Sequence, residues 1–292
     1  MYTYYHLTKQ AVHQHRTRMI ERELYYATLL DQSREVRKHH GRMGAKVIYD
    51  LLQPQHIGRV RFERLLMSNG FQVRRIKNYF KTTDSNGFTF YSNLIAGTTL
   101  TGINQVWVSD ITYFLASDGT MYYLITIMDL YSRRIIGYAA SLTMEAEQTS
   151  MKALAMALKF RGIELYDQLI HHSDRGGQYR YKEYMRRLND HNIKISMCDS
   201  VYDNAHMERF NGTLKNDYLC LLDTSSLRKL RSSLKRTIWL YNEQRPHSSI
   251  MKMPPAAYEQ YIQTLPTDQR PKQKIHEQIS ISKKSEKKKA NK

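Results

Sequence analysis

Three acidic residues stand where a carboxylate could do chemistry, and Asp110 is the first of them. It interrupts an otherwise apolar run at residues 106–113 that has the composition of a β-strand. A carboxylate buried without a partner costs on the order of several kcal/mol, so its presence there needs a reason such as a bound metal ion. The plain alternatives are an edge strand whose Asp faces solvent and an ion pair with Lys or Arg.

Asp174 and Glu208 are the other two candidates. Asp174 follows an apolar strand and precedes a Gly-Gly pair, so a strand end and a glycine turn can present its carboxylate in a cleft, although capping of the turn is the simpler interpretation. Glu208 lies in a predicted helix with Asp203 as its N-cap, where a solvated acid is also common. Lys215 lies two helical turns beyond Glu208, which predicts that the two share a face.

Together the three carboxylates indicate metal-dependent chemistry. Two neighbouring strands and the following helix could bring Asp110, Asp174 and Glu208 to one point, and oxygen ligands of this kind suit Mg²⁺. Two such ions, roughly 3.5–4 Å apart, activate the attacking oxygen and stabilise the leaving oxygen in phosphodiester chemistry. The predicted cofactor is therefore a pair of Mg²⁺ or Mn²⁺ ions, with these three residues as ligands.

The elements that must position these residues follow in an informative order. Three strand-like runs separated by short turns predict an antiparallel meander at residues 106–114, 121–128 and 134–140. The elements that follow, before the helix with Glu208, are predicted as a helix at 144–160, a strand at 169–170, a helix at 181–189 and a strand at 193–197. This order is that of an α/β, ribonuclease-H-like catalytic core.

The N-terminal part of the chain has a helical pattern of its own. Residues 9–29 are compatible with one helix and residues 31–40 with the start of another. Two shorter helices, at 44–52 and 58–70, flank a turn that contains Pro54, an arrangement typical of an all-α helix-turn-helix. The alternative is a solvated basic helix in a small bundle.

The second of these short helices has an apolar and a basic face. Its apolar face consists of Phe62, Leu65 and Leu66, and its arginines point away from that face, as a helix entering a major groove requires. The predicted DNA contacts are Arg59, Arg61 and Arg64.

Composition divides the chain into four regions. We expect a helix-turn-helix region at 1–82, a glycine-containing linker at 83–104, the catalytic core at 105–265 and a basic disordered tail at 266–292. The net charge of +18 is concentrated in residues 31–82, which carry +8, and residues 270–292, which carry +7. This footprint indicates a polyanionic partner, with nucleic acid as the first candidate.

Several classes are disfavoured by what the sequence lacks. Cys198 and Cys220 give neither a disulfide framework nor a paired zinc motif, and no cysteine lies near His39 and His40, so we expect no zinc. No signal peptide or membrane span is evident, which favours a cytoplasmic, nucleoid-associated protein without a membrane partner. The pair His171-His172 is interpreted as strand packing with support for Asp174.

Four ordered motifs resemble those of a known family, the integrase-type DDE transposases of bacterial insertion sequences, and more narrowly the OrfB product of the IS-three family. The resemblance covers roughly residues 30–260. The motifs are those at 107–113, at 172–179, at 202–205 with Glu208, and at 241–247, which reads Tyr-Asn-Glu-Gln-Arg-Pro-His.

The resemblance implies both roles and partners. Asp110, Asp174 and Glu208 would be the catalytic triad, and Lys215 would contact DNA ends. The implied chemistry is nicking that frees a 3′-hydroxyl, followed by attack of that hydroxyl on another strand. The implied partners are element ends, target DNA, further copies of this chain on DNA and the upstream-frame product of the same element.

The chain departs from the family pattern around Glu208. Only 33 residues separate Asp174 from Glu208, two fewer than is usual in the family, and the segment 196–201 lacks the family's glycine. Arg209 also stands where family members have serine. The shortening falls in a loop, so Glu208 is retained as the third carboxylate.

Two other functions compete with this interpretation. A tyrosine recombinase would use the His-x-x-Arg match at His206 and Arg209 with Tyr241 as nucleophile, but it leaves Asp110 and Asp174 unexplained. A DNA-binding regulator or an inactive remnant of an element would use the helix-turn-helix alone. Metal-dependent strand cleavage separates these classes.

Overall fold

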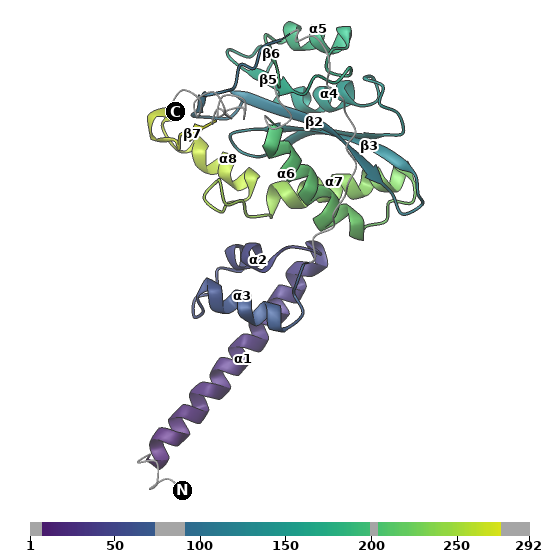
Figure 1. Ribbon diagram of the computed structural model, residues 1–292. Helices are drawn as coiled ribbons and strands as arrows, with labels where there is room; N and C mark the ends of the chain where they lie inside the picture. Colours follow the sequence, from purple (N-terminus) through teal and green to yellow (C-terminus); the bar gives the residue numbers. More distant parts are fainter. Residues whose placement is uncertain (1–7, 74–90, 199–203, 276–292) are drawn as a thin grey trace, which may run out of the picture. The chain divides into compact units, whose positions relative to one another are not determined.

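The computed structural model describes residues 8–73, 91–198 and 204–275, in two units that divide between Ile76 and Lys77. The first unit is helical and the second combines a sheet with helices (Figure 1). None of the described helices is long and apolar enough to cross a membrane.

The first unit consists of three helices around a small core. The helices are α1 (Lys9–His39), α2 (Ala45–Leu52) and α3 (Arg59–Ser68). The predicted break after Leu29 is wrong, because α1 runs without interruption for 31 residues and contains neither Gly nor Pro. The apolar face predicted for α3 is confirmed, since Phe62 and Leu66 are fully buried and Leu65 packs against the same core.

The second unit is built on a five-stranded sheet with the order β4-β3-β2-β5-β6. The first three strands along the chain form an antiparallel meander, as predicted, and the last two pair in parallel. The strands are β2 (Val106–Leu115), β3 (Met121–Asp129), β4 (Ile135–Ser141), β5 (Ile170–Ser173) and β6 (Lys194–Met197).

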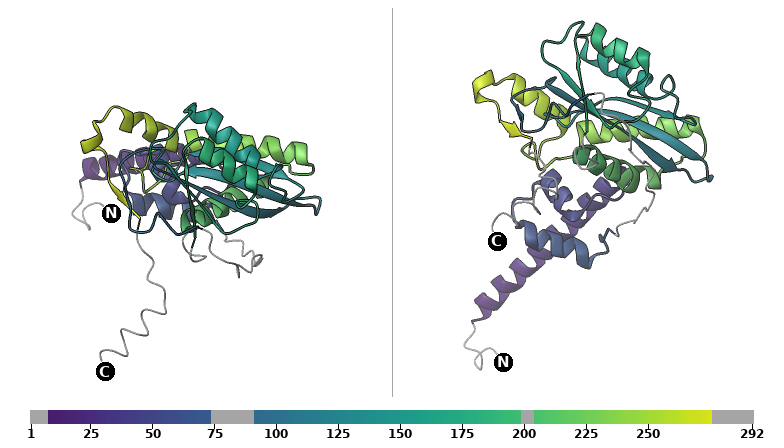
Figure 2. Two further views of the ribbon diagram at one scale, coloured as in Figure 1. Left: turned by 90° about the horizontal axis from the view of Figure 1, so that it is seen from above. Right: turned by 45° about the horizontal axis from the view of Figure 1, so that its top comes forward.

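Helices cover both faces of this sheet (Figures 1 and 2). Successive side chains of β2 point to opposite faces of the sheet, so Val106 and Val108 belong to one core cluster and Trp107 to the other. The Trp107 face is covered by α4 (Ser150–Arg161) and α5 (Lys182–Asp190). The opposite face is covered by α6 (Ala205–Thr213), α7 (Leu227–Glu243) and α8 (Pro255–Gln263).

This topology is the ribonuclease-H-like fold that the order of elements predicts. Two boundaries differ clearly, because α4 begins at Ser150 rather than at residue 144 and β5 covers Ile170–Ser173 rather than residues 169–170. Residues 146–149, directly before α4, form a turn in which the Glu145 and Ala146 carbonyls accept the Thr149 N–H. Three short helical segments, η2 (Leu214–Tyr218), η3 (Leu219–Leu221) and η4 (Thr267–Gln269), complete the connections.

A second, two-stranded sheet extends the folded unit at both ends. β1 (Thr99–Leu100) pairs antiparallel with β7 (Gln273–Lys274), and Ile95 and Leu100 are buried in the main core. Residues 91–104 of the predicted linker and 267–275 of the predicted tail are thus part of the folded unit. The backbone N–H and C=O groups of β1 and β7 are satisfied by pairing with each other, which composition alone does not predict. The tail beyond residue 275 lies outside the described residues.

Candidate active site

Asp110 lies in the middle of β2 on the face that α6 covers. It shares this face with Val106 and Val108, and it pairs across to Thr126 of β3. Burial and the negative charges of Asp174 and Glu208 raise the pKa of Asp110 to about 7, against the opposing effects of the Ile111 N–H and Lys215. A carboxylate with such a raised pKa is held where a cation would stabilise its charged form.

Asp174 comes directly after β5, the parallel neighbour of β2. Val108 stands opposite His172 in this pairing. Asp110 and Asp174 each lie two residues further along, so the same register places them beside each other. Its Oδ1 accepts a hydrogen bond from the Gly176 N–H at 3.0 Å, and burial raises its pKa. A Cβ at Gly176 would lie 2.9 Å from Oε1 of Gln178 and 3.0 Å from Oδ1 of Asp174, so a side chain here would displace one or both of these groups.

Glu208 is carried by α6, which two side chains tie to β2. Asn204, at the N-terminus of the helix, donates to the Ser109 carbonyl at 3.0 Å, and Asn211 donates to Oδ2 of Asp110 at 2.7 Å. Glu208 lies between these two contacts, and its side chain is exposed. The predicted N-cap, Asp203, lies outside the described residues.

Lys215 contacts β2, but, contrary to the prediction from the sequence, it does not lie on the same regular helix as Glu208. α6 ends at Thr213, and Lys215 belongs to η2, a π-helical segment that breaks the simple two-turn relation to Glu208. Its Nζ donates to the Thr112 hydroxyl at 2.8 Å. Burial lowers the pKa of Lys215, whereas the charge of Asp110 raises it, so the ammonium lies within electrostatic reach of the Asp110 carboxylate.

The donor set fits a hard divalent cation. The ligands on offer are carboxylate oxygens, and a cation would relieve the repulsion that raises the pKa of Asp110. Asn211 adds a buried Oδ1 without a hydrogen-bond partner beside them. In this arrangement no group of three His, Cys, Asp or Glu among the described residues is close enough to hold a metal ion. The structure thus pairs Asp110 with Asp174 and leaves Glu208 within electrostatic reach.

Comparison with known proteins places the chain in a family. Integrase core domain models match residues 101–202 and 189–255. An uncharacterised 31 kDa protein of insertion element IS600 from Shigella sonnei is 38% identical over 213 residues, which cover 71% of this chain and 77% of that protein. The chain belongs to the IS3 family of integrase-type transposases.

Other similarities are more partial. Transposase InsF of insertion sequence IS3A from Escherichia coli K12 is 37% identical over 161 residues, and the match spans 54% of each chain, so about half of that relative is covered. The HTLV-2 integrase catalytic core domain, solved in complex with magnesium, is 18% identical with a TM-score of 0.43 and matches 57% of this chain and 99% of that one.

The hydrogen bonds beneath the carboxylates involve residues that sequence reasoning missed. In this transposase the Tyr179 hydroxyl lies 2.8 Å from that of Ser109, which itself donates to the Thr126 carbonyl. The bond therefore joins the Asp174 loop to β2 next to Asp110. Burial raises the pKa of Tyr179, and the charges of Asp174 and Asp110 raise it further. Its place in the motif at 172–179 is the only sequence signal for this role.

His171 and His172 of β5 are buried between the sheet and the elements that pack against it, as predicted. The His171 Nε2 lies 2.9 Å from the Tyr184 hydroxyl, and burial lowers the pKa of His171 to about 3, so its ring is neutral. The His172 Nδ1 lies 2.9 Å from the Ser196 hydroxyl, and its Nε2 lies 3.2 Å from Sγ of Cys198. These bonds join β5 to α5 and to the end of β6, and they stiffen the strand that presents Asp174.

Tyr241 is not placed to act as a nucleophile. It is only 4% exposed and packs edge-on against Phe210 of α6, with ring centroids 4.8 Å apart. Burial raises the pKa of Tyr241 to about 12, so its hydroxyl is neutral at physiological pH. The tyrosine recombinase interpretation is therefore disfavoured both by the burial of Tyr241 and by the family to which the chain belongs.

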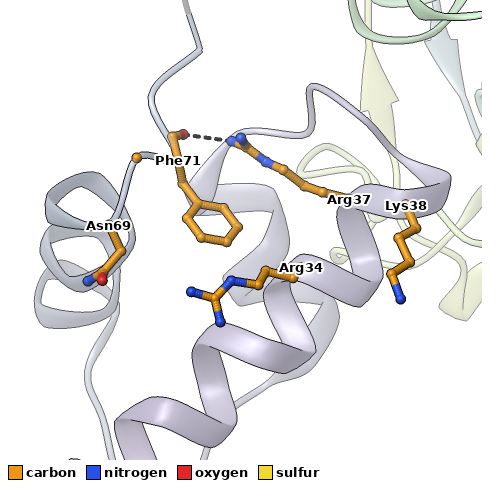
Figure 3. A pocket seen from close by; sticks show the side chains of 6 residues that line it. Arg34, Arg37, Lys38, Asn69 and Phe71 are labelled. Atoms are coloured by element: carbon orange, nitrogen blue, oxygen red, sulfur yellow. Dashed lines mark hydrogen bonds between the residues drawn. The ribbon is translucent and has the colours of Figure 1, made fainter.

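The three arginines predicted to contact DNA are all solvent-exposed. Arg59, Arg61 and Arg64 lie on the open side of α3, and Arg59 forms an ion pair with Glu63 at 3.4 Å. A hollow of about 410 Å³ lies elsewhere in this unit (Figure 3). Two of its cations, Arg34 and Lys38, are paired with Asp31 and Glu35, and it contains none of the candidate carboxylates. The hollow is lined by Arg34, Arg37, Lys38, Asn69, Gly70 and Phe71.

Proposed function

We propose that this transposase cuts and rejoins DNA strands with two divalent metal ions, Mg²⁺ or Mn²⁺, held by Asp110, Asp174 and Glu208. The observation that carries the proposal is the gathering of three carboxylates at the central strand β2, where burial together with the charges of Asp174 and Glu208 raises the pKa of Asp110 to about 7. When bound, the ions activate the attacking oxygen and stabilise the leaving oxygen of the phosphodiester.

The protein's own residues prepare this site in distinct ways. Asp110 and Asp174 are fixed on adjacent strands, and Asn211 holds one oxygen of Asp110 through a 2.7 Å hydrogen bond. Glu208 is exposed on a helix that is itself tied to β2, and we propose that rotation of its side chain brings it to the other carboxylates. Lys215, anchored on Thr112 next to the site, supplies a positive charge for the phosphates of a DNA end.

The DNA partner is supported by both units. The exposed arginines of α3 suit a major groove, so Arg59, Arg61 and Arg64 are the proposed contacts of the first unit. We further propose that the substrates are element ends and target DNA, and that copies of this chain assemble on them in the cell's nucleoid. Cooperation with an upstream-frame product of the same element is part of the same proposal.

The test compares Glu208→Gln with Tyr241→Phe in the full chain. Glu208→Gln keeps the shape and removes a ligand charge, so cleavage and strand transfer of duplexes that carry the element's ends should fall by orders of magnitude. Tyr241→Phe should retain activity, because this hydroxyl is buried. The readout is gel analysis of labelled strands with Mg²⁺ and with EDTA.

A covalent adduct is the contrary outcome. A tyrosine nucleophile would leave a protein-DNA adduct and would react in EDTA. We expect full EDTA sensitivity and no adduct. An adduct at Tyr241, or an active Glu208→Gln protein, would refute the assigned carboxylates, and an intact protein that binds but never cuts would instead indicate a DNA-binding regulator.

A further inference from the structure

The two strands that carry Asp110 and Asp174 stop pairing before they reach these residues. In the described part of the chain the pairing of β2 with β5 ends where Val108 stands opposite His172. Asp110 lies two residues beyond this last pair on β2, and Asp174 follows at the same distance after β5. The backbone ladder therefore does not itself fix the distance between the two carboxylates, which repel each other unless a cation lies between them.

Tyr179 bridges the same two strands from the opposite face of the sheet. It is buried and belongs to the core cluster of Trp107, on the face away from Asp110. Its ring packs against that of His171 in β5, with centroids 6.1 Å apart. Its hydroxyl lies 2.8 Å from that of Ser109 in β2. One side chain thus links the two strands at the first residue of β2 beyond the end of the ladder.

The direction of this hydrogen bond follows from a third residue. The Ser109 hydroxyl donates to the Thr126 carbonyl at 3.1 Å, and a hydroxyl has only one proton to donate. The Tyr179 hydroxyl therefore donates to Ser109. Thr126 is the residue of β3 that stands opposite Asp110, so the bridge continues through β2 to the strand on its other side.

A short and internally bonded loop connects Tyr179 to Asp174. The Tyr179 N–H donates to the Gly176 carbonyl at 3.0 Å, and the Gly176 N–H donates to Oδ1 of Asp174, also at 3.0 Å. The Gln178 carbonyl accepts a hydrogen bond from the Ser150 hydroxyl at the start of α4, at 3.1 Å. A shift of the Tyr179 ring would therefore also move the Asp174 carboxylate.

Ser109 is also the point at which α6 is attached to β2. Its carbonyl accepts a hydrogen bond from the Asn204 side chain at 3.0 Å, at the N-terminus of the helix that carries Glu208. Ser109 itself is fully buried and directly precedes Asp110 in the strand. An uncharged residue next to one carboxylate thus has hydrogen bonds to the elements that carry the other two.

We propose that Ser109 and Tyr179 are positioning residues for the metal ions, and that their hydrogen bond holds Asp174 at the distance from Asp110 at which one cation binds both carboxylates. Side chains of adjacent residues in β2 point to opposite faces of the sheet, so the Ser109 hydroxyl acts through the strand and does not touch the metal ion or the DNA. The inference rests on the proposed function, because it takes the two carboxylates as metal ligands.

Loss of this hydrogen bond should change metal affinity more than the rate of the chemical step. Without it, repulsion moves the two carboxylates apart in the metal-free protein, and binding of the cation then has to bring them back together. Once the cation is bound, the same ligands surround it in both proteins. The bond therefore contributes preorganisation of the metal site.

The main test is Mn²⁺ binding by the full chain without DNA, followed through the electron paramagnetic resonance signal of free Mn²⁺. Tyr179→Phe removes one hydroxyl and keeps the ring, so the variant should fold, which circular dichroism checks. Its Mn²⁺ affinity should fall by about tenfold, the lower end of the roughly 10–100-fold range for a lost supporting hydrogen bond.

Tyr166→Phe is the matched control. Tyr166 is buried in the same core cluster and packs edge-on against Trp107 of β2, with ring centroids 5.2 Å apart. Its hydroxyl is buried and has no hydrogen-bond partner among the described residues. Removing this hydroxyl should leave the Mn²⁺ affinity unchanged.

Ser109→Ala tests whether the two residues act through one bond. Tyr179→Phe should have little further effect on Mn²⁺ affinity in the Ser109→Ala background, because the acceptor of the bond is already missing. In DNA cleavage, the Mg²⁺ concentration for half-maximal activity should rise in Tyr179→Phe, with little change in the rate at saturating Mg²⁺.

Three results would overturn the inference. They are an unchanged Mn²⁺ affinity in Tyr179→Phe, even if its Tm is lower, an equal loss of affinity in Tyr166→Phe, and independent effects of the Ser109 and Tyr179 substitutions. The first would show that the bond serves stability alone, and the second that any buried hydroxyl of this core has the same influence.

The outcomes also separate this inference from the proposed function. A wild type that cuts DNA in Mg²⁺, with an unchanged Mn²⁺ affinity in Tyr179→Phe, would remove the positioning role and keep the function. A wild type that never cuts DNA, but whose Mn²⁺ affinity depends on Tyr179 and Ser109 together, would support the positioning role and remove the function.

Discussion

At the scale of single residues, the candidate active site brings negatively charged carboxylates close together, and the side-chain amide of Asn211 donates a hydrogen bond to one of them, Asp110. Asp110 lies between Asp174, Glu208 and Lys215, and the balance of these charges with burial puts its pKa at about 7. Asn211 is the group that touches it directly, at 2.7 Å. Both residues give measurable expectations.

Replacing Asn211 with Ala should weaken metal binding. The amide orients Asp110, and loss of such a supporting hydrogen bond typically lowers metal affinity by roughly 10–100-fold. The Mg²⁺ concentration for half-maximal cleavage should rise accordingly, with a smaller change in the rate at saturating Mg²⁺. Asn216→Ala, in η2, removes an amide that makes no side-chain hydrogen bond in the described residues and should leave the Mg²⁺ dependence unchanged.

Asp110 should also make stability depend on pH in the metal-free protein. Its folded pKa of about 7 lies above the ordinary value of 3.8, so the folded state binds an extra proton between these values and loses stability as pH rises through them. Asp110→Asn should therefore raise the Tm relative to wild type by several degrees at pH 8 and hardly at all at pH 4.

Calorimetry at the two pH values, in EDTA, measures this difference. Added Mg²⁺ should raise the Tm of the wild type at pH 8 and have little effect on Asp110→Asn. A Tm difference that does not change with pH would show that Asp110 is not the residue with the raised pKa.

At the scale of elements, the fold's stability at the far end of the sheet depends on a buried ionic network. Arg161, the last residue of α4, forms ion pairs with Asp129 of β3 at 3.1 Å and with Glu259 of α8 at 2.7 Å. Arg134 also binds Glu259, at 2.8 Å. Glu259 thereby joins α8 to α4 and to the β3–β4 turn, and Asp129 joins α4 to β3.

Removing one partner of this network should be strongly destabilising. Arg161→Met leaves two buried carboxylates without their main counter-ion, and the free energy of unfolding should fall by about 3–5 kcal/mol. Arg186→Met breaks the exposed pair with Glu183 and should change it by less than about 1 kcal/mol. Urea denaturation of both variants provides the comparison, and similar midpoints would contradict a structural role for the network.

At the scale of the whole molecule, most of the positive charge lies outside the segment that carries the candidate carboxylates. The helical unit ends at Ile76, and residues 83–269, which include the carboxylates, hold a net charge of only +1 out of +18. DNA affinity should therefore depend heavily on parts of the chain that do not take part in the chemistry.

The double variant Arg61→Ala, Arg64→Ala tests this division. Both side chains are exposed on α3, so DNA binding should weaken while metal-dependent joining of pre-cut ends stays measurable. Electrophoretic mobility shifts and a strand-transfer assay on the same protein give the two readouts. Equal loss in both assays would mean that α3 belongs to the catalytic assembly itself.

Much of the fold and of the candidate site could be predicted from the sequence, because periodicity within an element is local information. The alternation around Asp110, the strand end before Asp174 and the apolar face of α3 all appear in the structure as the sequence indicates. The ribonuclease-H-like order of elements and the transposase family follow from such patterns together with the four motifs.

What only the tertiary structure decided depends on contacts between elements far apart in the chain. The bond from Asn211 to Asp110 spans 101 positions, and that from Tyr179 to Ser109 spans 70, so no spacing rule encodes them. The π-helical turn redirects Lys215 toward Thr112, and pairing of β1 with β7 draws an expected linker and tail into the fold. Packing of whole elements sets which polar groups meet, and the buried Nε and Nη1 of Arg133, which have no hydrogen-bond partner among the described residues, become visible only once that packing is known.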